Sequence, residues 1–243
     1  MKIMDEKTRL KEKADEINNI IKEKIVSDNP NLLPIYDGIL DIDKYFNAKY
    51  KIMWILKEPY ADFDENGNPE GGGQHIRDII VPKQTIQEFS SSQRTFRPMI
   101  YASWSILNNF ILWEDLNDVN DDPLMIDALR SVAYINVKKI PGHTESNRSV
   151  IDYAYQQHKD ILLKQIEYYN PDIIIGGYTL YNFLEDLGIK RENMVHYNSL
   201  DYIVHKQKLF IDPYHPAQHS FKQQDYCNDI INCAKKNIDK IAK

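Results

Sequence analysis

Four short apolar runs, well separated along the chain, constrain the fold of this 243-residue protein more than any other feature. They are KIMWIL at 51–56, VAYINV at 132–137, DIIIG at 172–176 and KLFID at 208–212. Apolar runs this short are typical of strands that are buried on both faces. Because helical segments separate them, the sequence predicts a three-layer α/β/α sandwich around a central, mostly parallel four-stranded sheet.

Helical spacing of apolar residues and the positions of breaker residues predict the surrounding helices. Residues 5–25 carry isoleucines at helical spacing, and the Asp28-Asn29-Pro30 cluster should end that helix. Residues 201–212 suggest a hairpin whose second arm is the fourth strand. Further helices are expected over 98–113, 150–169 and 179–187, and from about residue 221 or 225 to the C-terminus.

The composition favours an ordinary globular protein with one core. Hydrophobic residues make up 42% and charged residues 27% of the chain, and its length suits one core with insertions. We expect a single domain over 1–243, monomeric, with an N-terminal helical extension at 1–30 that covers the core. The motifs described below fall within 51–220.

Neither a membrane nor a cofactor is predicted. No apolar run approaches the roughly 18 residues that a membrane span needs, and the charged first residues do not resemble a secretory signal, so we expect a cytoplasmic protein. The two cysteines, Cys227 and Cys233, are too few for a structural zinc site or a four-thiolate iron–sulfur cluster. Both are expected to be buried thiols, and we expect no metal site.

The net charge of −6 argues against a protein that binds DNA through bulk electrostatics. A local basic groove stays open, because a site needs only a few phosphate contacts. The candidates for such a groove are Arg94, Arg97, Lys138, Lys139, Arg148 and Lys222.

The residues that follow the predicted strands are the candidates for function, because open α/β sheets bind ligands at the carboxyl ends of their strands. They supply a carboxylate, an amide and an imidazole at three different strand ends. In chain order they are Lys57-Glu58-Pro59-Tyr60, Asn136 with Lys138-Lys139, Gly176-Gly177 and His215-Pro216.

The order of these motifs resembles that of the uracil-DNA glycosylase superfamily, whose members carry an acidic, proline-containing motif after the first strand and His-Pro after the last. Gly67-Asn68-Pro69 stands at the spacing of the family's G-x-P. YINVKKIPGHTESNR and PDIIIGGYTLYNFL look like the family's second and third strand segments, and DPYHPAQ looks like its Y-H-P-S. The resemblance covers roughly Lys51 to Ser220.

The resemblance implies a hydrolase that cleaves the N-glycosidic bond of uracil or another deaminated base in DNA, without a cofactor. Glu58 would be the carboxylate near the sugar, and His215 would donate a hydrogen bond to the departing base. Asn136 would bind the edge of the flipped base. The remaining residues implied are Lys57, Pro59, Tyr60 and Pro216 around the substrate, and Lys138, Asn147 and Arg148 on the DNA.

The chain departs from the family pattern at several positions. Lys57 stands beside the acid, Glu70 occupies the position of the family's stacking aromatic, and Ala217 replaces the serine after His-Pro. These departures motivate an alternative, a nucleic-acid or nucleotide-binding protein that kept the fold without the chemistry. A third reading is an unrelated α/β hydrolase that acts on a small nucleoside.

Overall fold

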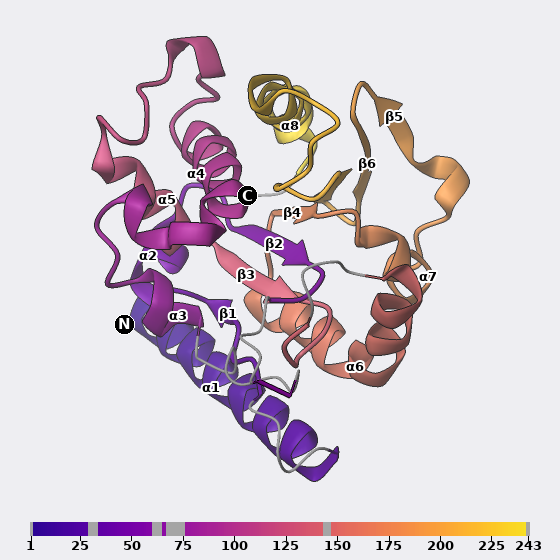
Figure 1. Cartoon of the computed structure of the whole chain (residues 1–243). Helices are drawn as coiled ribbons and strands as arrows, with labels where there is room; N and C mark the ends of the chain where they lie inside the picture. Colours follow the sequence, from indigo (N-terminus) through magenta and orange to yellow (C-terminus); the bar gives the residue numbers. More distant parts are fainter. Residues whose placement is uncertain (1, 29–33, 60–64, 67–75, 143–146, 242–243) are drawn as a thin grey trace.

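The computed structural model describes residues 2–28, 34–59, 65–66, 76–142 and 147–241, and its centre is a seven-stranded mixed sheet. The order across the sheet is β1-β3-β2-β4-β7-β6-β5 (Figure 1). The α/β class is therefore as expected, whereas the predicted four-stranded sheet is too small. The strands are β1 (Gly38–Ile39), β2 (Ile52–Leu56), β3 (Ala133–Asn136), β4 (Ile173–Gly176), β5 (Val195–Tyr197), β6 (Leu200–His205) and β7 (Lys208–Pro213).

The four apolar runs form neighbouring strands in the middle of this sheet. β3, β2, β4 and β7 are mutually parallel, while β1, β6 and β5 extend the two sides in antiparallel pairing. The outer strands lack a strong sequence signal for a physical reason. β1 has only two residues, and β5 is largely exposed, so neither needs a continuous apolar run.

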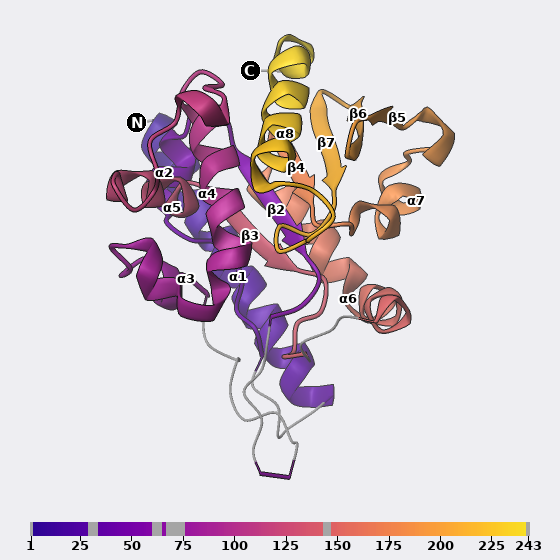
Figure 2. The same cartoon turned by 45° about the horizontal axis from the view of Figure 1, so that its top comes forward.

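Helices cover both faces of the sheet (Figures 1 and 2). α4 (Gln93–Leu107) and α8 (Gln223–Asn237) pack on the face that carries Trp54 and Leu56. α6 (Arg148–Tyr169) packs on the opposite face, which carries Met53 and Ile55, and α1 (Lys2–Asp28) packs against α6. Alternate side chains of one strand point to opposite faces, so β2 alone contributes to two separate apolar clusters.

The remaining helices are short. The α-helices are α2 (Ile42–Asn47), α3 (Ile76–Ile80), α5 (Asp127–Arg130) and α7 (Leu184–Leu187). The 3₁₀ helices are η1 (Ile86–Ser92), η2 (Trp113–Asp115), η3 (Pro123–Ile126), η4 (Leu180–Asn182), η5 (Arg191–Asn193) and η6 (Ile238–Lys240).

Two predicted helices differ from the observed ones. The helix expected over 98–113 begins at Gln93, contains Pro98, and ends at Leu107 because Asn109 and Phe110 adopt positive φ angles of 67° and 61°. The helix expected over 179–187 is split into η4 and α7.

The N-terminal helix is part of the packed structure. Ile17, Ile21 and Ile25 of α1 are buried against Ile161 of α6, which agrees with the expected helical spacing. The two cysteine thiols are also buried, as expected.

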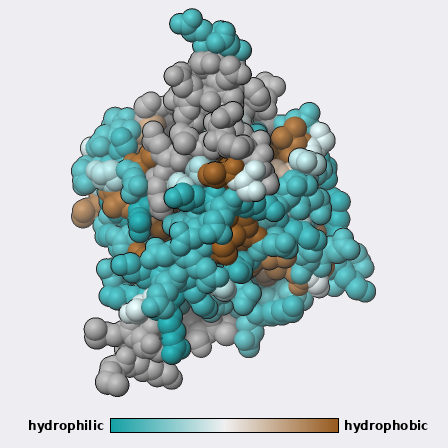
Figure 3. All heavy atoms as spheres, turned by 90° about the horizontal axis from the view of Figure 1, so that it is seen from below, coloured by the Kyte–Doolittle hydropathy of each residue, from teal (hydrophilic) through white to brown (hydrophobic). Residues whose placement is uncertain are grey.

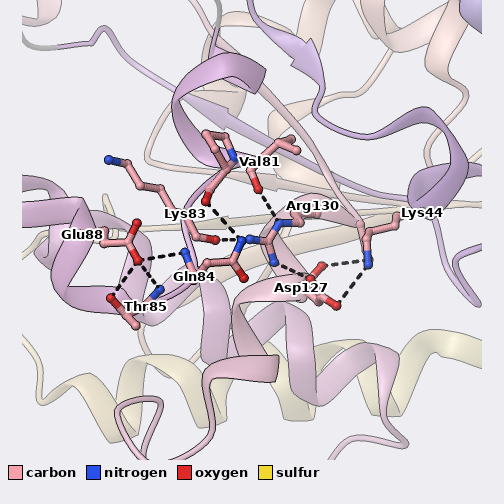
Figure 4. Close-up of polar contacts among 10 residues, drawn as sticks. Lys44, Val81, Lys83, Gln84, Thr85, Glu88, Asp127 and Arg130 are labelled. Carbon is pink, nitrogen blue, oxygen red and sulfur yellow. Dashed lines mark hydrogen bonds and ion pairs between the residues drawn. The ribbon is translucent and has the colours of Figure 1, made fainter.

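A buried guanidinium holds the segment between α3 and α4 in place (Figure 4). Arg130 Nε donates to the Val81 carbonyl at 2.9 Å, and the same side chain contacts the Lys83 carbonyl and the Asp127 carboxylate. Lys44 of α2 reaches the other Asp127 oxygen at 3.0 Å. These contacts join α5 to α2 and to the segment that follows α3.

None of the helices within the described residues is long and apolar enough to cross a membrane. On the face that is turned downward in Figure 1, the described residues in view are mostly hydrophilic, with small and separate hydrophobic areas (Figure 3).

Candidate functional site

The carboxyl ends of β2, β3, β4 and β7 meet at one edge of the sheet, because these strands are parallel (Figure 2). The hydrogen-bond ladder continues past the strand ends. Val137 N–H donates to the Leu56 carbonyl at 2.9 Å, and Lys138 N–H donates to the Lys57 carbonyl at 3.0 Å. Gly177 N–H donates to the Ile55 carbonyl at 2.8 Å. The segment after β2 is therefore held between the segments after β3 and β4.

The register decides which side chains share a face of this edge. Leu56 pairs with Asn136, so Glu58 falls beside Lys138 on the same face as Asn136, and Lys57 falls on the opposite face. Glu58 Oε2 and Lys138 Nζ form an ion pair at 2.7 Å, with side chains that are only 4% and 13% exposed. Lys138, expected as a DNA contact, is thus directed at the carboxylate.

Gly142 makes room for the Glu58 carboxylate. A Cβ atom at position 142 would overlap the carboxylate group, and Gly142 N–H donates to the Pro59 carbonyl at 2.9 Å. The close approach of backbone to side chain requires glycine at this position.

Asn136 is fully buried at the end of β3. The Tyr134 hydroxyl donates to its Oδ1 at 3.3 Å, whereas its Nδ2 has no hydrogen-bond partner among the described residues. A buried amide without a partner is costly, and such groups are often completed by a ligand or an ordered water. The Nδ2 group is therefore an enclosed donor at the end of β3 that has no partner among the described residues.

A buried ionic network supports the backbone of Asn136. Asp37 Oδ2 accepts from Asn136 N–H at 2.6 Å, and both Asp37 oxygens accept from Lys139 Nζ at 2.8 and 2.9 Å. Gln165 of α6 bonds to both Lys139 and Asp37. Burial lowers the pKa of Lys139, and the charge of Asp37 counters that effect. Lys139 is therefore not part of a surface groove, because its side chain is fully buried beside Asp37.

His215 is a neutral hydrogen-bond donor. Its Nδ1 accepts from Ala217 N–H at 3.2 Å, so the proton of the neutral ring resides on Nε2. Burial and the nearby Lys57 charge lower the pKa of His215 to about 4. The ring and Pro216 lie beside Gly177, next to the Leu56 side chain at the end of β2.

Lys57 and Asp212 lie on the opposite face of the strand ends. Burial lowers the pKa of Lys57, while the charges of Glu58 and Asp212 oppose that shift. Asp212 accepts from the N–H groups of Thr179 and Leu180 at 3.1 and 3.3 Å, and burial raises its pKa to about 7. Asp212 is not among the residues predicted for the site, although an acid at the end of a predicted buried strand is itself a signal.

The structure thus brings some of the expected residues together. Glu58 and Asn136 lie on one face at the ends of adjacent strands, and His215 lies near Gly177 at the end of β4, next to Leu56. Asn147 and Arg148 lie at the start of α6, where Asn147 is the N-cap and Arg148 is exposed. Tyr60, Glu70 and the Gly67-Asn68-Pro69 segment lie outside the described residues.

No protein-family model matches this sequence, and a search of the curated proteins finds no significant match. The fold and the strand-end residues define an α/β protein with a carboxylate, a buried amide and a neutral imidazole at one edge of its sheet. Across the described ranges, no group of three or more His, Cys, Asp or Glu residues is placed to hold a metal ion.

Proposed function

We propose that this protein is a DNA glycosylase-like hydrolase that cleaves the N-glycosidic bond of uracil or another deaminated base. The observation that carries the proposal is the fully buried Nδ2 of Asn136, which has no hydrogen-bond partner among the described residues and lies on the same face as the Glu58 carboxylate. A base flipped out of its stack offers acceptor atoms on its edge that such an amide can bind. The strand-end motifs that resemble the uracil-DNA glycosylase superfamily agree with this assignment.

Cleavage makes two opposite charges, and the residues at the strand ends suit both. The bond from C1′ to the base nitrogen breaks, and its electron pair leaves with the base. His215 Nε2–H donates to the base oxygen that gains negative charge, and the neutral ring remains a donor at neutral pH. Glu58 stabilises the positive sugar and accepts a proton from the water that bonds to C1′.

Lys138 and Lys57 have different roles in this proposal. Lys138 holds the Glu58 carboxylate in position through the 2.7 Å ion pair, so it acts as a positioning residue. Lys57 lies close enough to His215 for its charge to lower that pKa, and its positive charge favours the anionic base as it departs.

The test is an excision assay on single- and double-stranded oligonucleotides that carry uracil, hypoxanthine or xanthine, with free nucleosides in parallel. We expect abasic product from at least one oligonucleotide, and a loss of roughly 10²-fold or more for Glu58→Gln and for His215→Ala. Tyr197→Leu, on β5 at the far edge of the sheet, is the control and should retain activity. Absence of product from every oligonucleotide at high enzyme concentration rejects the proposal, and cleavage of free nucleosides alone supports a small-molecule hydrolase.

A second candidate is a nucleic-acid-binding protein of the same fold without catalysis. The observation that favours it is that the Glu58 carboxylate is 4% exposed and already paired with Lys138. This candidate predicts binding of oligonucleotides with no abasic product. Lys138→Met separates the two candidates. If the protein is a glycosylase, releasing Glu58 changes the rate of cleavage; if it only binds nucleic acid, neither the unaltered protein nor the variant cleaves.

A further inference from the structure

A row of aromatic side chains lies beside the candidate site, next to Lys57, and one of its members directly precedes His215 in the chain. Tyr181 and Tyr178 have ring centroids 5.8 Å apart, Tyr178 and Tyr214 are stacked at 5.6 Å with 10° between their planes, and Tyr214 and Phe221 are 5.4 Å apart. We call these four residues the aromatic row. They come from the segments after β4 and after β7, so the row follows the edge at which the strands end.

The aromatic row is exposed where most large apolar side chains of this protein are buried. Tyr178 and Tyr214 are each 43% exposed, and Phe221 is 37% exposed. Three adjoining exposed rings indicate a binding surface. Single exposed apolar residues are ordinary on protein surfaces, whereas contiguous ones often mark a site for a ligand or partner. Packing of the core does not account for the row.

The backbone at Tyr178 gives an independent indication. Tyr178 has a φ angle of 60°, in the left-handed region that a bulky residue rarely adopts, and its N–H donates to the Pro213 carbonyl at 2.8 Å. Glycine would relieve the strain, yet this position carries a tyrosine that is only partly buried and is stacked on Tyr214. Strained residues that are held by their surroundings cluster at ligand-binding sites.

Cations flank the aromatic row. The Arg148 guanidinium lies over the Tyr181 ring at 4.5 Å, and Lys57 Nζ lies 6.0 Å from the centre of the Tyr178 ring. Arg148 also faces Asp152 at 3.9 Å, an exposed pair that is too weak to hold the guanidinium away from a phosphate. Lys222 follows Phe221 in the chain.

From this geometry we infer that the aromatic row binds single-stranded nucleic acid, with unpaired bases stacked on the rings and phosphates at Arg148 and Lys222. Stacking suits unpaired bases of any sequence, because every base has an aromatic face, whereas the bases of a duplex keep theirs inside the stack. A protein partner would need about 800 Å² of complementary surface, and a single row of rings is narrow for that. The inference deepens the proposed function, on which it rests for its biological context, by naming the form of substrate.

Fluorescence anisotropy with labelled oligonucleotides of about 20 nucleotides tests the inference, using DNA and RNA single strands and the matching duplex. We expect the single strands to bind more tightly than the duplex. Tyr178→Asn keeps a residue that tolerates the left-handed backbone, and Tyr214→Leu keeps an apolar side chain. Each should weaken binding roughly 5- to 100-fold. Arg148→Gln should reduce the slope of log K against log salt by roughly 0.7.

Tyr197→Leu is the matched control, because Tyr197 also packs under a cation, Lys236 at 4.4 Å, but lies on β5 at the far edge. It should bind as the unaltered protein does, and circular dichroism should show all variants folded. The inference is overturned if the folded Tyr178→Asn and Tyr214→Leu proteins bind single strands unchanged, if the duplex binds equally well, or if no oligonucleotide binds. If the single strands bind through the aromatic row but no base is excised, only the glycosylase proposal is rejected. If bases are excised but binding does not depend on the aromatic row, only this inference is rejected.

Discussion

At the scale of single residues, the candidate site depends on positions that carry no side chain. Gly142 accommodates the Glu58 carboxylate, and Gly177 accommodates Leu56 and the His215 ring. Gly177 directly follows β4, and Gly142 bonds to the Pro59 carbonyl in the segment after β2. At both positions the backbone of one segment meets the side chain of another.

Gly142→Ala tests this placement. The added Cβ overlaps the Glu58 carboxylate, so we expect a loss of stability of roughly 1 to 3 kcal/mol and displacement of Glu58 from Lys138. Excision activity should fall by more than the decrease in the folded fraction accounts for. Gly188→Ala is the control, because a Cβ there meets nothing within 4 Å and strains only the backbone at a φ angle of 72°. Urea denaturation and the excision assay measure both effects; equal activity in the two variants would contradict the role given to Gly142.

At the scale of secondary-structure elements, polar contacts add to apolar packing in joining the short helices. The Arg130 side chain is 10% exposed and joins α5 to the Val81 and Lys83 carbonyls. β3 begins only three residues after Arg130, so this junction also helps to fix the strand that carries Asn136.

Arg130→Met should lower the free energy of unfolding by about 1 to 3 kcal/mol, because it removes the donor of two partly buried carbonyls and leaves Asp127 with only Lys44 among the partners described above. Lys7→Met is the matched control. Its ion pair with Asp43 is exposed, at 42% and 70%, and its removal should cost less than about 1 kcal/mol. Chemical denaturation of both variants measures the difference, and similar losses would show that the Arg130 contacts do not hold these elements.

At the scale of the whole molecule, the buried side chains of Asp212 and His215 make the free energy of unfolding change with pH in opposite directions. The pKa of Asp212 is raised to about 7 in the folded protein, so its contribution to stability falls as the pH rises from about 4 to 7. The pKa of His215 is lowered to about 4, so its contribution is present above pH 6.5 and falls as the pH drops towards 4. The two contributions therefore partly cancel in this window.

Replacing either residue should reveal the contribution of the other. Asp212→Asn should lose stability on acidification from pH 6.5 to 4, by roughly 1 to 3 kcal/mol, because the His215 contribution is no longer offset. His215→Asn should instead lose stability as the pH rises from 4 to 7, because Asp212 must ionise while buried. Urea denaturation across this range measures both slopes, and parallel curves for the two variants would contradict the assignment.

The extent to which the fold could be predicted depends on how local each signal is. The buried parallel strands carry continuous apolar runs, and the isoleucines of α1 carry the helical period, so both were visible in the sequence. The two-residue β1 and the exposed β5 have no comparable pattern. The end of α4 at Leu107 depends on left-handed residues that the apolar spacing does not indicate.

The α/β class and the residues at the strand ends follow from the sequence alone, because a buried strand is marked by a local apolar run. What those residues face follows from contacts between distant segments. Glu58 and Lys138 are 80 positions apart, and Lys139 and Asp37 are 102 apart, so their pairing follows from register and layer packing. The same contacts turned two expected surface lysines inward and assembled the aromatic row from segments that no single motif connects.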